Sequence, residues 1–537
     1  MLVPLFANQR LYDGNSKEYI EVRRLCQVAG VVGPSSALPV NGEELVMALD
    51  RIDSSSLSPA LRNRYDVLYA QIAPEKKNFE VAIPVEFSPQ VFLSTNQKGD
   101  RKDFFIPFRD ERALMNFGLQ MFFSDVVFME TAMPIRNIST ADHIPYTSFD
   151  FFYDSNTDIF HTMPLLARGS FGNDMFSLYL GRTRHSMGNG YTGNMVVGDN
   201  YPYQEVLNVK FTSNYFTYNI DITHFDTQRT NGDISGIYES FVSATFDNPH
   251  IDGRQQTRVV HRFDFNILDK VRFALNMGTV YYGSASMDFR WLFPFMIFHS
   301  YYNYSEDELI KDNDEANNIM GLEIDYPIIP KLNLSAQIVM DQFQIPGRED
   351  GNAVPNAFGA LLSISYVEMT KDRDYVGFFE FAMTSPYLYV APKKNNEVEY
   401  NWNYDYYLGY YSRQNVVGLN PSSDGAWSGY GYGPNSLVCA LGFNFNELNW
   451  KLESKTVLSY IMKGDESRGI ETFYNETERG GLLMGPYKHM LRIREDVSYF
   501  VYDCLELMAA TELSYIYAND SHDFDAELYL GLTWHVM

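Results

Sequence analysis

The chain has 537 residues, with 42 Lys and Arg against 68 Asp and Glu, and a formal net charge of −26 at pH 7. So acidic a chain lacks the basic surface that phosphate backbones require, which argues against nucleic acid as a partner. The three cysteines, Cys26, Cys439 and Cys504, stand far apart, which argues against a disulfide framework and a cysteine-based zinc site.

The start of the chain has helical spacing. Residues 1–7 are apolar but too short for the core of a signal peptide, and could be the remnant of an export signal. Three helices are predicted. The first spans 18–29, the second follows a capping box formed by Asn41 and Glu44, and the third begins at Ser58-Pro59. Residues 1–75 are therefore predicted to form a small helical domain. Since three short helices bury little core alone, we expect them to dock on the rest of the chain.

After residue 76 the apolar residues alternate with polar ones. The clearest case is 331–341, where one face carries Leu332, Leu334, Ala336, Ile338 and Met340. The segments 215–225, 258–267 and 524–536 show the same period of two, which predicts β-strands with one apolar face. Such strands are longer than those of soluble sheets and suit tilted strands that cross a membrane.

The connections between these strands alternate between short and long. Tight turns are predicted near 213–214, 268–270, 327–330 and 446–447, and long polar connections at 226–257, 282–316, 342–356, 385–433 and 461–486. This pattern is typical of outer-membrane barrels, which carry their long loops at one end. We therefore predict an all-β fold, an antiparallel transmembrane β-barrel over 76–537. It has about five strands before Arg184 and about thirteen after Glu205, near eighteen in total. A soluble β-sandwich is the alternative.

The glycine-rich segment 182–204 is the best candidate for a binding site. It combines cations, amides and tyrosines that can hydrogen-bond to sugar hydroxyls or stack on sugar faces. The candidate ligand-binding residues are Arg182, Arg184, His185, Asn189, Tyr191, Asn194, Asp199, Asn200 and Tyr203. The alternative is a structural turn that closes or pinches the barrel.

A second aromatic region, 385–433, holds ten tyrosines with Trp402 and Trp427. It could contact carbohydrate or form part of the aromatic girdle of a membrane barrel. No HExxH, GxSxG or P-loop motif occurs, so we expect no enzyme, and neither a metal nor a cofactor. Charges expected to face the lumen would tune a passive pore; they are Arg258, Arg262, Asp264, Lys451, Glu453 and Lys455.

Several segments resemble, in the same order, the Wzi family of capsule-assembly outer-membrane proteins. They are 36–39 (SALP), 43–45 (EEL), 181–190 (GRTRHSMGNG), 196–200 (VVGDN), 290–299 (RWLFPFMIFH), 321–325 (GLEID), 341–344 (DQFQ) and 431–435 (GYGPN). One departure is Met187, which stands where the family has a tryptophan.

The resemblance implies an eighteen-stranded barrel with a periplasmic helical domain, and a protein that holds or organises surface polysaccharide like a lectin. We expect the outer membrane of a diderm bacterium as its location. The expected partners are outer-membrane lipid, lipopolysaccharide or an equivalent glycolipid, surface polysaccharide and the outer-membrane assembly machinery, with the chain itself a monomer. A passive channel for small solutes and a barrel enzyme acting on lipid or glycan stay open.

Overall fold

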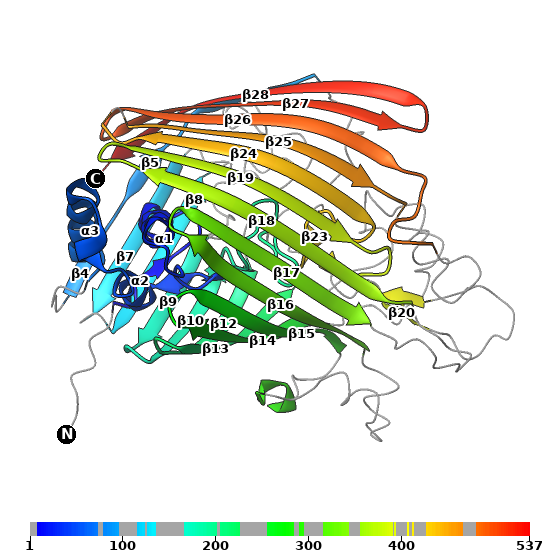
Figure 1. The fold of residues 1–537 in the computed structure, drawn as a ribbon, viewed down its shortest axis with the longest axis horizontal. Helices are drawn as coiled ribbons and strands as arrows, with labels where there is room; N and C mark the ends of the chain where they lie inside the picture. Colours follow the sequence, from blue (N-terminus) through cyan, green and yellow to red (C-terminus); the bar gives the residue numbers. More distant parts are fainter. Residues whose placement is uncertain are drawn as a thin grey trace, which may run out of the picture.

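In a computed structural model of the chain, the residues that can be described are 8–73, 79–95, 115–123, 126–135, 166–200, 204–225, 255–283, 289–294, 315–342, 355–389, 391–393, 405–407, 411–412, 426–449, 451–465 and 480–536. They form a barrel with a group of helices at one end (Figure 1).

All three predicted helices are present: α1 (Lys17–Ala29), α2 (Gly42–Leu49) and α3 (Pro59–Ile72), with a 3-10 turn η1 (Ser54–Ser56) between the last two. The capping box before α2 is confirmed, since the Glu44 amide donates to Asn41 Oδ1 at 2.9 Å and the Asn41 amide donates to Glu44 Oε2 at 3.0 Å. The Leu61 amide donates to Ser58 Oγ at 3.4 Å, which caps α3. No helix in the described ranges is long and apolar enough to cross a membrane.

The barrel strands pair antiparallel with their neighbours, and the ring closes where β28 meets β5 and β6. The segments β4, β5 and β6 share one place in the ring, between β28 and β7, so the barrel has eighteen strands. Their bounds are β4 (Phe79–Ala82), β5 (Val85–Phe87), β6 (Gln90–Ser94), β7 (Met115–Phe123), β8 (Val127–Ile135), β9 (Leu166–Gly172), β10 (Phe176–Thr183), β12 (Gln204–Thr212), β13 (Phe216–Phe225), β14 (Gln255–Ile267), β15 (Val271–Gly283), β16 (Glu315–Ile329), β17 (Leu332–Gln342), β18 (Ala357–Met369), β19 (Arg373–Thr384), β24 (Ser436–Glu447), β25 (Leu452–Lys463), β26 (Lys488–Tyr502), β27 (Leu505–Ala518) and β28 (Ser521–Val536).

The predicted all-β barrel is confirmed, including its division into five strands before Arg184 and thirteen from Gln204 onward. The turns at 213–215 and 268–270 lie where they were predicted. Two predicted turns were misplaced. The strand β16 continues through Pro327, which sits at a register shift where a missing amide proton is tolerated, and the turn follows at 330–331. Residues 446 and 447 belong to β24, so the turn there begins only at 448.

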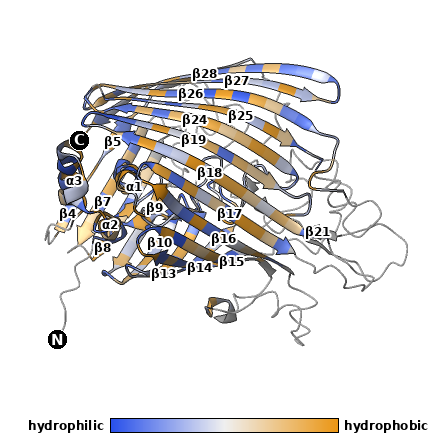
Figure 2. Cartoon of the chain, viewed as in Figure 1, coloured by the Kyte–Doolittle hydropathy of each residue, from blue (hydrophilic) through white to orange (hydrophobic). Residues whose placement is uncertain are grey.

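The two faces of the strands differ as the alternation predicted. On β17, Ile338 and Met340 point outward and are 52% and 38% exposed, whereas the inward-facing Ser335 and Gln337 are buried. Hydrophobic and hydrophilic residues alternate along the strands in Figure 2. Apolar side chains that face away from the molecule along a closed barrel require lipid around them.

The helical domain docks on the end of the barrel that carries the short turns (Figure 1). Gln27 Nε2 donates to the carbonyl oxygens of Lys331 and Ser365 at 3.0 and 2.9 Å. Arg64 Nη1 lies 2.6 Å from Asp374 Oδ1, and this pair is buried. Barrel residues Val367 and Val376 also share one apolar cluster with the helices. The expected docking of the helices on the rest of the chain is thus confirmed.

Candidate functional site

The segment that connects α1 to α2 enters the barrel from the short-turn end. Arg272 on β15 donates from Nη2 to the carbonyl oxygen of Gly33 at 2.6 Å. Ser36 Oγ donates to Glu323 Oε1 at 2.8 Å and accepts from Arg262 Nη2 at 2.7 Å. Polar side chains of the barrel wall therefore hold residues 33–36 inside the lumen.

These wall residues form a buried ion cluster. Arg262 lies 2.8 Å from Asp264 and 2.8 Å from Glu323, and all three side chains are at most 2% exposed. Such a cluster is stable only while every charge keeps its partner. Arg258, Arg262 and Asp264 do face inward as predicted, and each is hydrogen-bonded to other side chains of the protein. Among the other predicted lumen charges, Glu453 and Lys455 are exposed and lie on the inner face of β25, the same face as Ile461, and Lys451 directly precedes this strand.

The segment after β10 folds back into the barrel from the opposite end. Its strand β11 (Ser186–Met187) pairs with β2 (Ala37–Leu38) of the entering N-terminal segment. The Tyr191 and Thr192 amides donate to the Glu380 carboxylate at 2.7 and 2.6 Å. The Met195 amide donates to Gln337 Oε1 at 2.9 Å. The two segments therefore meet inside the lumen and are tied to its wall.

Two further stretches, 387–389 and 427–432, join them. Tyr389 Oη donates to the carbonyl oxygen of Met195 at 2.5 Å and accepts from the Tyr430 amide at 3.0 Å. The Gly198 amide donates to the Ser428 carbonyl oxygen at 2.8 Å. We call the segments 186–198, 387–389 and 427–432 the cork.

The cork packs against a ring of apolar residues on the inner wall. Every barrel strand from β14 to β27 contributes one buried inward side chain, and these side chains share one cluster with the cork. The ring consists of Val260, Val280, Ile319, Val339, Leu361, Ala382, Val438, Ile461, Met490 and Ile516. An apolar ring on the inner wall fits a packed interior rather than a water-filled pore.

Three of the predicted site residues, Arg182, Arg184 and Asp199, lie beside the cork rather than within it. Arg182 faces the outer side of β10, opposite Glu205 on β12, and Nη2 lies 2.5 Å from Glu205 Oε1. Arg184 Nη2 lies 2.8 Å from Asp199 Oδ2, and these side chains are 24% and 38% exposed. The Arg184–Asp199 pair is therefore the part of the predicted site that remains partly accessible at the long-loop end.

The other predicted residues in the described ranges serve the cork. His185 Nδ1 lies 2.6 Å from the Leu38 carbonyl oxygen and Nε2 lies 3.0 Å from Asp221 Oδ2. Asn194 Oδ1 accepts from Gln337 Nε2 at 2.8 Å. Asn200 Nδ2 donates to the Trp427 and Gly429 carbonyl oxygens, both at 2.6 Å. The Tyr191 ring stacks on Phe378 with a centroid separation of 3.9 Å. Asn189 is buried, and Tyr203 lies outside the described residues. Their role in ligand binding stays a prediction.

Five aromatic residues of 385–433 have an unexpected place. Tyr387, Tyr389, Trp427, Tyr430 and Tyr432 are all at most 4% exposed, so they neither reach solvent nor join an outer girdle. Trp402 lies outside the described residues. The signal that could have revealed the cork is the run SGYGYG at 428–433, because glycines let the backbone approach closely.

Met187 is likewise buried, at 1% exposed, and pairs with Ala37. The position at which the resemblance to the Wzi family implies a tryptophan therefore faces the interior of the cork. A side chain there does not reach a ligand outside the barrel.

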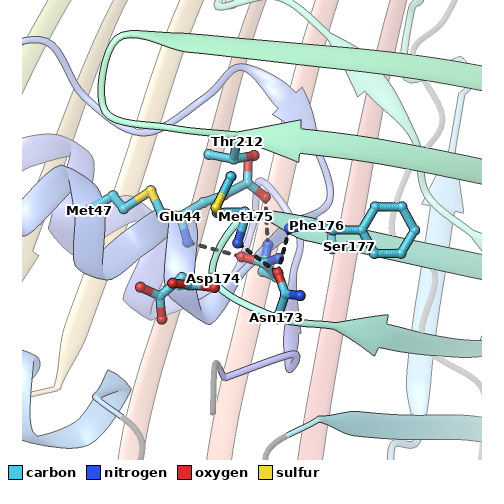
Figure 3. A pocket seen from close by; sticks show the side chains of 10 residues that line it. Glu44, Met47, Asn173, Asp174, Met175, Phe176, Ser177 and Thr212 are labelled. Carbon is cyan, nitrogen blue, oxygen red and sulfur yellow. Dashed lines mark hydrogen bonds between the residues drawn. The ribbon is translucent and has the colours of Figure 1, made fainter. Parts of the chain in front are cut away.

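A small depression lies between α2 and the turn that joins β9 to β10 (Figure 3). Asn173 shapes this turn, since its side-chain oxygen accepts from the Met175 and Phe176 amides at 2.8 Å. Burial, together with the charges of Asp174 and Asp50, raises the pKa of Glu43 to about 7. The depression is thus a place where two elements bring carboxylates together.

The sequence matches no family model and no curated protein. Among solved structures, the fold is similar to that of Wzi of Escherichia coli, described as an outer membrane protein involved in group 1 capsule assembly and a carbohydrate binding β-barrel. The TM-score is 0.56 at 14% identity, over 97% of this chain and 98% of that chain. The fold is that of an outer-membrane β-barrel.

More distant likenesses are to outer-membrane channels. The channel DcaP of Acinetobacter baumannii gives a TM-score of 0.37 at 9% identity, over 86% of this chain and 99% of that chain. OprD of Pseudomonas aeruginosa gives 0.38 at 9% identity, over 86% of this chain and 97% of that chain.

Proposed function

We propose that this protein is a closed outer-membrane barrel that binds surface polysaccharide at its long-loop end. The observation that carries the proposal is the cork, whose residues share one buried apolar cluster with inward side chains of the strands from β14 to β27. A passive channel for small solutes needs a continuous aqueous path, and an apolar packed cluster in the lumen opposes it. The similarity to Wzi, described as a carbohydrate binding barrel, agrees with this choice.

The Arg184–Asp199 pair is the proposed contact with the polysaccharide. An arginine can form charge-assisted hydrogen bonds with an acidic sugar, and a carboxylate accepts bonds from sugar hydroxyls. Both side chains lie on the segment that enters the cork, so the rigid interior fixes the backbone that presents them. Pre-organised contacts of this kind lose less entropy on binding.

We propose a binding role rather than catalysis. The most buried histidine–carboxylate pair, His185 with Asp221, has one ring nitrogen on the Leu38 carbonyl oxygen and the other on the carboxylate. A ring held on both sides is not free to take a proton from a nucleophile. The proposed surroundings are lipid and lipopolysaccharide around a monomeric barrel, with the helical domain in the periplasm.

The test measures binding of purified protein to acidic and neutral polysaccharides from the surface of diderm bacteria. Arg184→Ala should weaken binding of an acidic polysaccharide by about tenfold, because one charge-assisted hydrogen bond contributes about 1.5–3 kcal/mol. Lys331→Ala is the matched control, since it also removes a cation from a partly exposed ion pair, at the short-turn end. Equal effects of the two substitutions, or no binding by the unaltered protein, would refute the proposal.

A further inference from the structure

The outer face of β25, β26 and β27 carries a polar patch. Glu495 lies between Arg494 and Asp496 in the sequence, and these two neighbours form an ion pair at 2.7 Å. Arg494 faces inward, because it stands opposite the buried Glu512 on β27. Because side chains alternate along a strand, Glu495 points outward.

Hydroxyl groups surround this carboxylate. Ser454 Oγ donates to Glu495 Oε1 at 2.6 Å, and the Thr456 hydroxyl donates to Oε2. Thr456 on β25 and Thr511 on β27 are the direct cross-strand neighbours of Glu495. We call Ser454, Thr456, Glu495 and Thr511 the outer polar patch.

The patch lies in the middle of the apolar band. Towards the long-loop end, the outward neighbours are Leu458, Ile493 and Leu513, which are 42–44% exposed. Towards the short-turn end, Leu507 is 41% exposed on the same face, and Val497 follows Glu495 along β26. The patch is therefore enclosed by apolar side chains on both sides.

Tyrosines bracket this band. Tyr499 follows Glu495 on β26, and Tyr460 and Tyr515 stand on the other side of the patch on β25 and β27, all with rings partly exposed outward. Each is four residues from a patch residue on its own strand, about 10 Å along a tilted strand. Aromatic girdles mark the two membrane interfaces, so Glu495 lies between them, out of reach of lipid headgroups.

The fold does not require a carboxylate here. Glu495 lies at the middle of β26, and the outer faces of β16, β17 and β18 near the middle of each strand carry Leu322, Ile324, Ile338, Leu362 and Ile364. A charge on the lipid-facing wall destabilises a barrel, and ionisable residues within a membrane usually mark a functional contact. The two hydroxyl groups reduce this cost, but the lipid around them offers the carboxylate no further hydrogen-bond donor.

We propose that the outer polar patch docks a membrane-embedded segment of another protein that brings a lysine or arginine side chain to Glu495. Charge complementarity selects this occupant, because the carboxylate already accepts from two neutral hydroxyl groups and a cation completes its pairing. The small residues Ser454, Thr456, Ala509 and Thr511 let a backbone approach closely. A two-fold contact between copies of this chain would instead bring two Glu495 carboxylates together.

The test uses peptides of about twenty Leu and Ala residues, long enough to span a bilayer, with a central lysine or a central leucine. The full-length protein and a fluorescent peptide are placed in phosphatidylcholine vesicles, and the apparent affinity is measured. We expect the lysine peptide to bind at least tenfold more tightly than the leucine peptide. Glu495→Gln should abolish this preference, whereas Thr511→Val should keep it.

Three results would overturn the proposal. The first is equal binding of both peptides by the unaltered protein. The second is a preference that Glu495→Gln leaves unchanged. The third is a dimer in detergent that Glu495→Gln dissociates, which would make a second copy the occupant.

A purely structural role is tested separately with Glu495→Leu in the same vesicles without peptide. If the patch exists for docking, the urea midpoint of this variant should equal or exceed that of the unaltered protein. A lower midpoint would show that the carboxylate serves to join β25 and β26 and would contradict the proposal. If Glu495→Leu does not fold, the peptide test with Glu495→Gln still decides the proposal.

Discussion

At the scale of single residues, His185 shows how the interior is held together. One ring nitrogen faces the Leu38 carbonyl oxygen and the other faces the Asp221 carboxylate, both of which accept hydrogen bonds. The His185 and Asp221 side chains are both fully buried, so this contact lies inside the lumen. One side chain therefore joins the N-terminal segment, the segment after β10 and the barrel wall.

Replacing His185 by alanine should destabilise the folded protein by about 3–5 kcal/mol, because it leaves the Asp221 charge buried with fewer partners. The measurement is the free energy of unfolding in lipid vesicles. The double substitution of His185→Ala with Asp221→Asn should recover a large part of the loss. If the double variant is no more stable than the single one, the His185–Asp221 pair does not carry the stability.

The two faces of the wall can be compared at adjacent residues. Leu458 on β25 is 42% exposed on the outer face, whereas Val457 faces inward, opposite Arg494 and close to the carboxylate that pairs with it. Leu458→Arg should cost about 2–4 kcal/mol near the middle of the bilayer, and Val457→Arg clearly less. Unfolding in vesicles of both variants measures the difference. Similar losses in the two would mean that the outer face is not in lipid.

At the scale of elements, we expect the docking of α2 on the β9–β10 turn to depend on the ionisation of Glu43. Its pKa is raised to about 7 by burial and by Asp174 and Asp50, above its ordinary value near 4.5. A raised carboxyl pKa means that the folded state binds more protons than the unfolded state between these values. Stability should therefore fall as the pH rises from about 4.5 to about 7 and stay lower above that.

Glu43→Gln should remove this pH dependence and protect α2 at pH 8. Hydrogen exchange of the amides of 42–49, corrected for the intrinsic effect of pH, measures the protection in both proteins. If the pH dependence persists unchanged in Glu43→Gln, another titrating group causes it.

The elements also show what the sequence can predict. Strand positions, the caps of α2 and α3, and the turns at 213–215 and 268–270 follow from local chemistry, such as the Asn41–Glu44 box or the period of two in 331–341. The position of residues 184–200 and 427–432 inside the barrel does not follow from local chemistry. Alternation shows which strand residues face inward, but it does not show which distant segment fills the space in front of them.

The predicted site illustrates this limit at single positions. The residue types that bind sugars, an arginine, amides and tyrosines, are also those that tie a glycine-rich segment to a barrel wall. Asn194 and Asn200 use their amides on Gln337 and on the backbone of the cork, and Arg182 pairs with Glu205 on the outer face. The sequence located the segment, but residue types alone could not separate a ligand contact from an internal one.

At the scale of the whole molecule, the barrel is filled from both ends. The N-terminal segment enters through the short-turn end and is held by buried charges, whereas the cork packs on an apolar ring near the long-loop end. The strand pair β2–β11 joins the N-terminal segment to the cork. The central claim is therefore that the lumen is closed in the folded state.

Single-channel recording in a planar lipid bilayer tests this claim most directly. The unaltered protein should insert without producing stable conductance steps, and replacement of residues 427–432 by a Gly-Ser linker should produce them. A steady ohmic conductance of the unaltered protein, comparable to that of an open porin, would contradict a closed lumen and favour the passive channel.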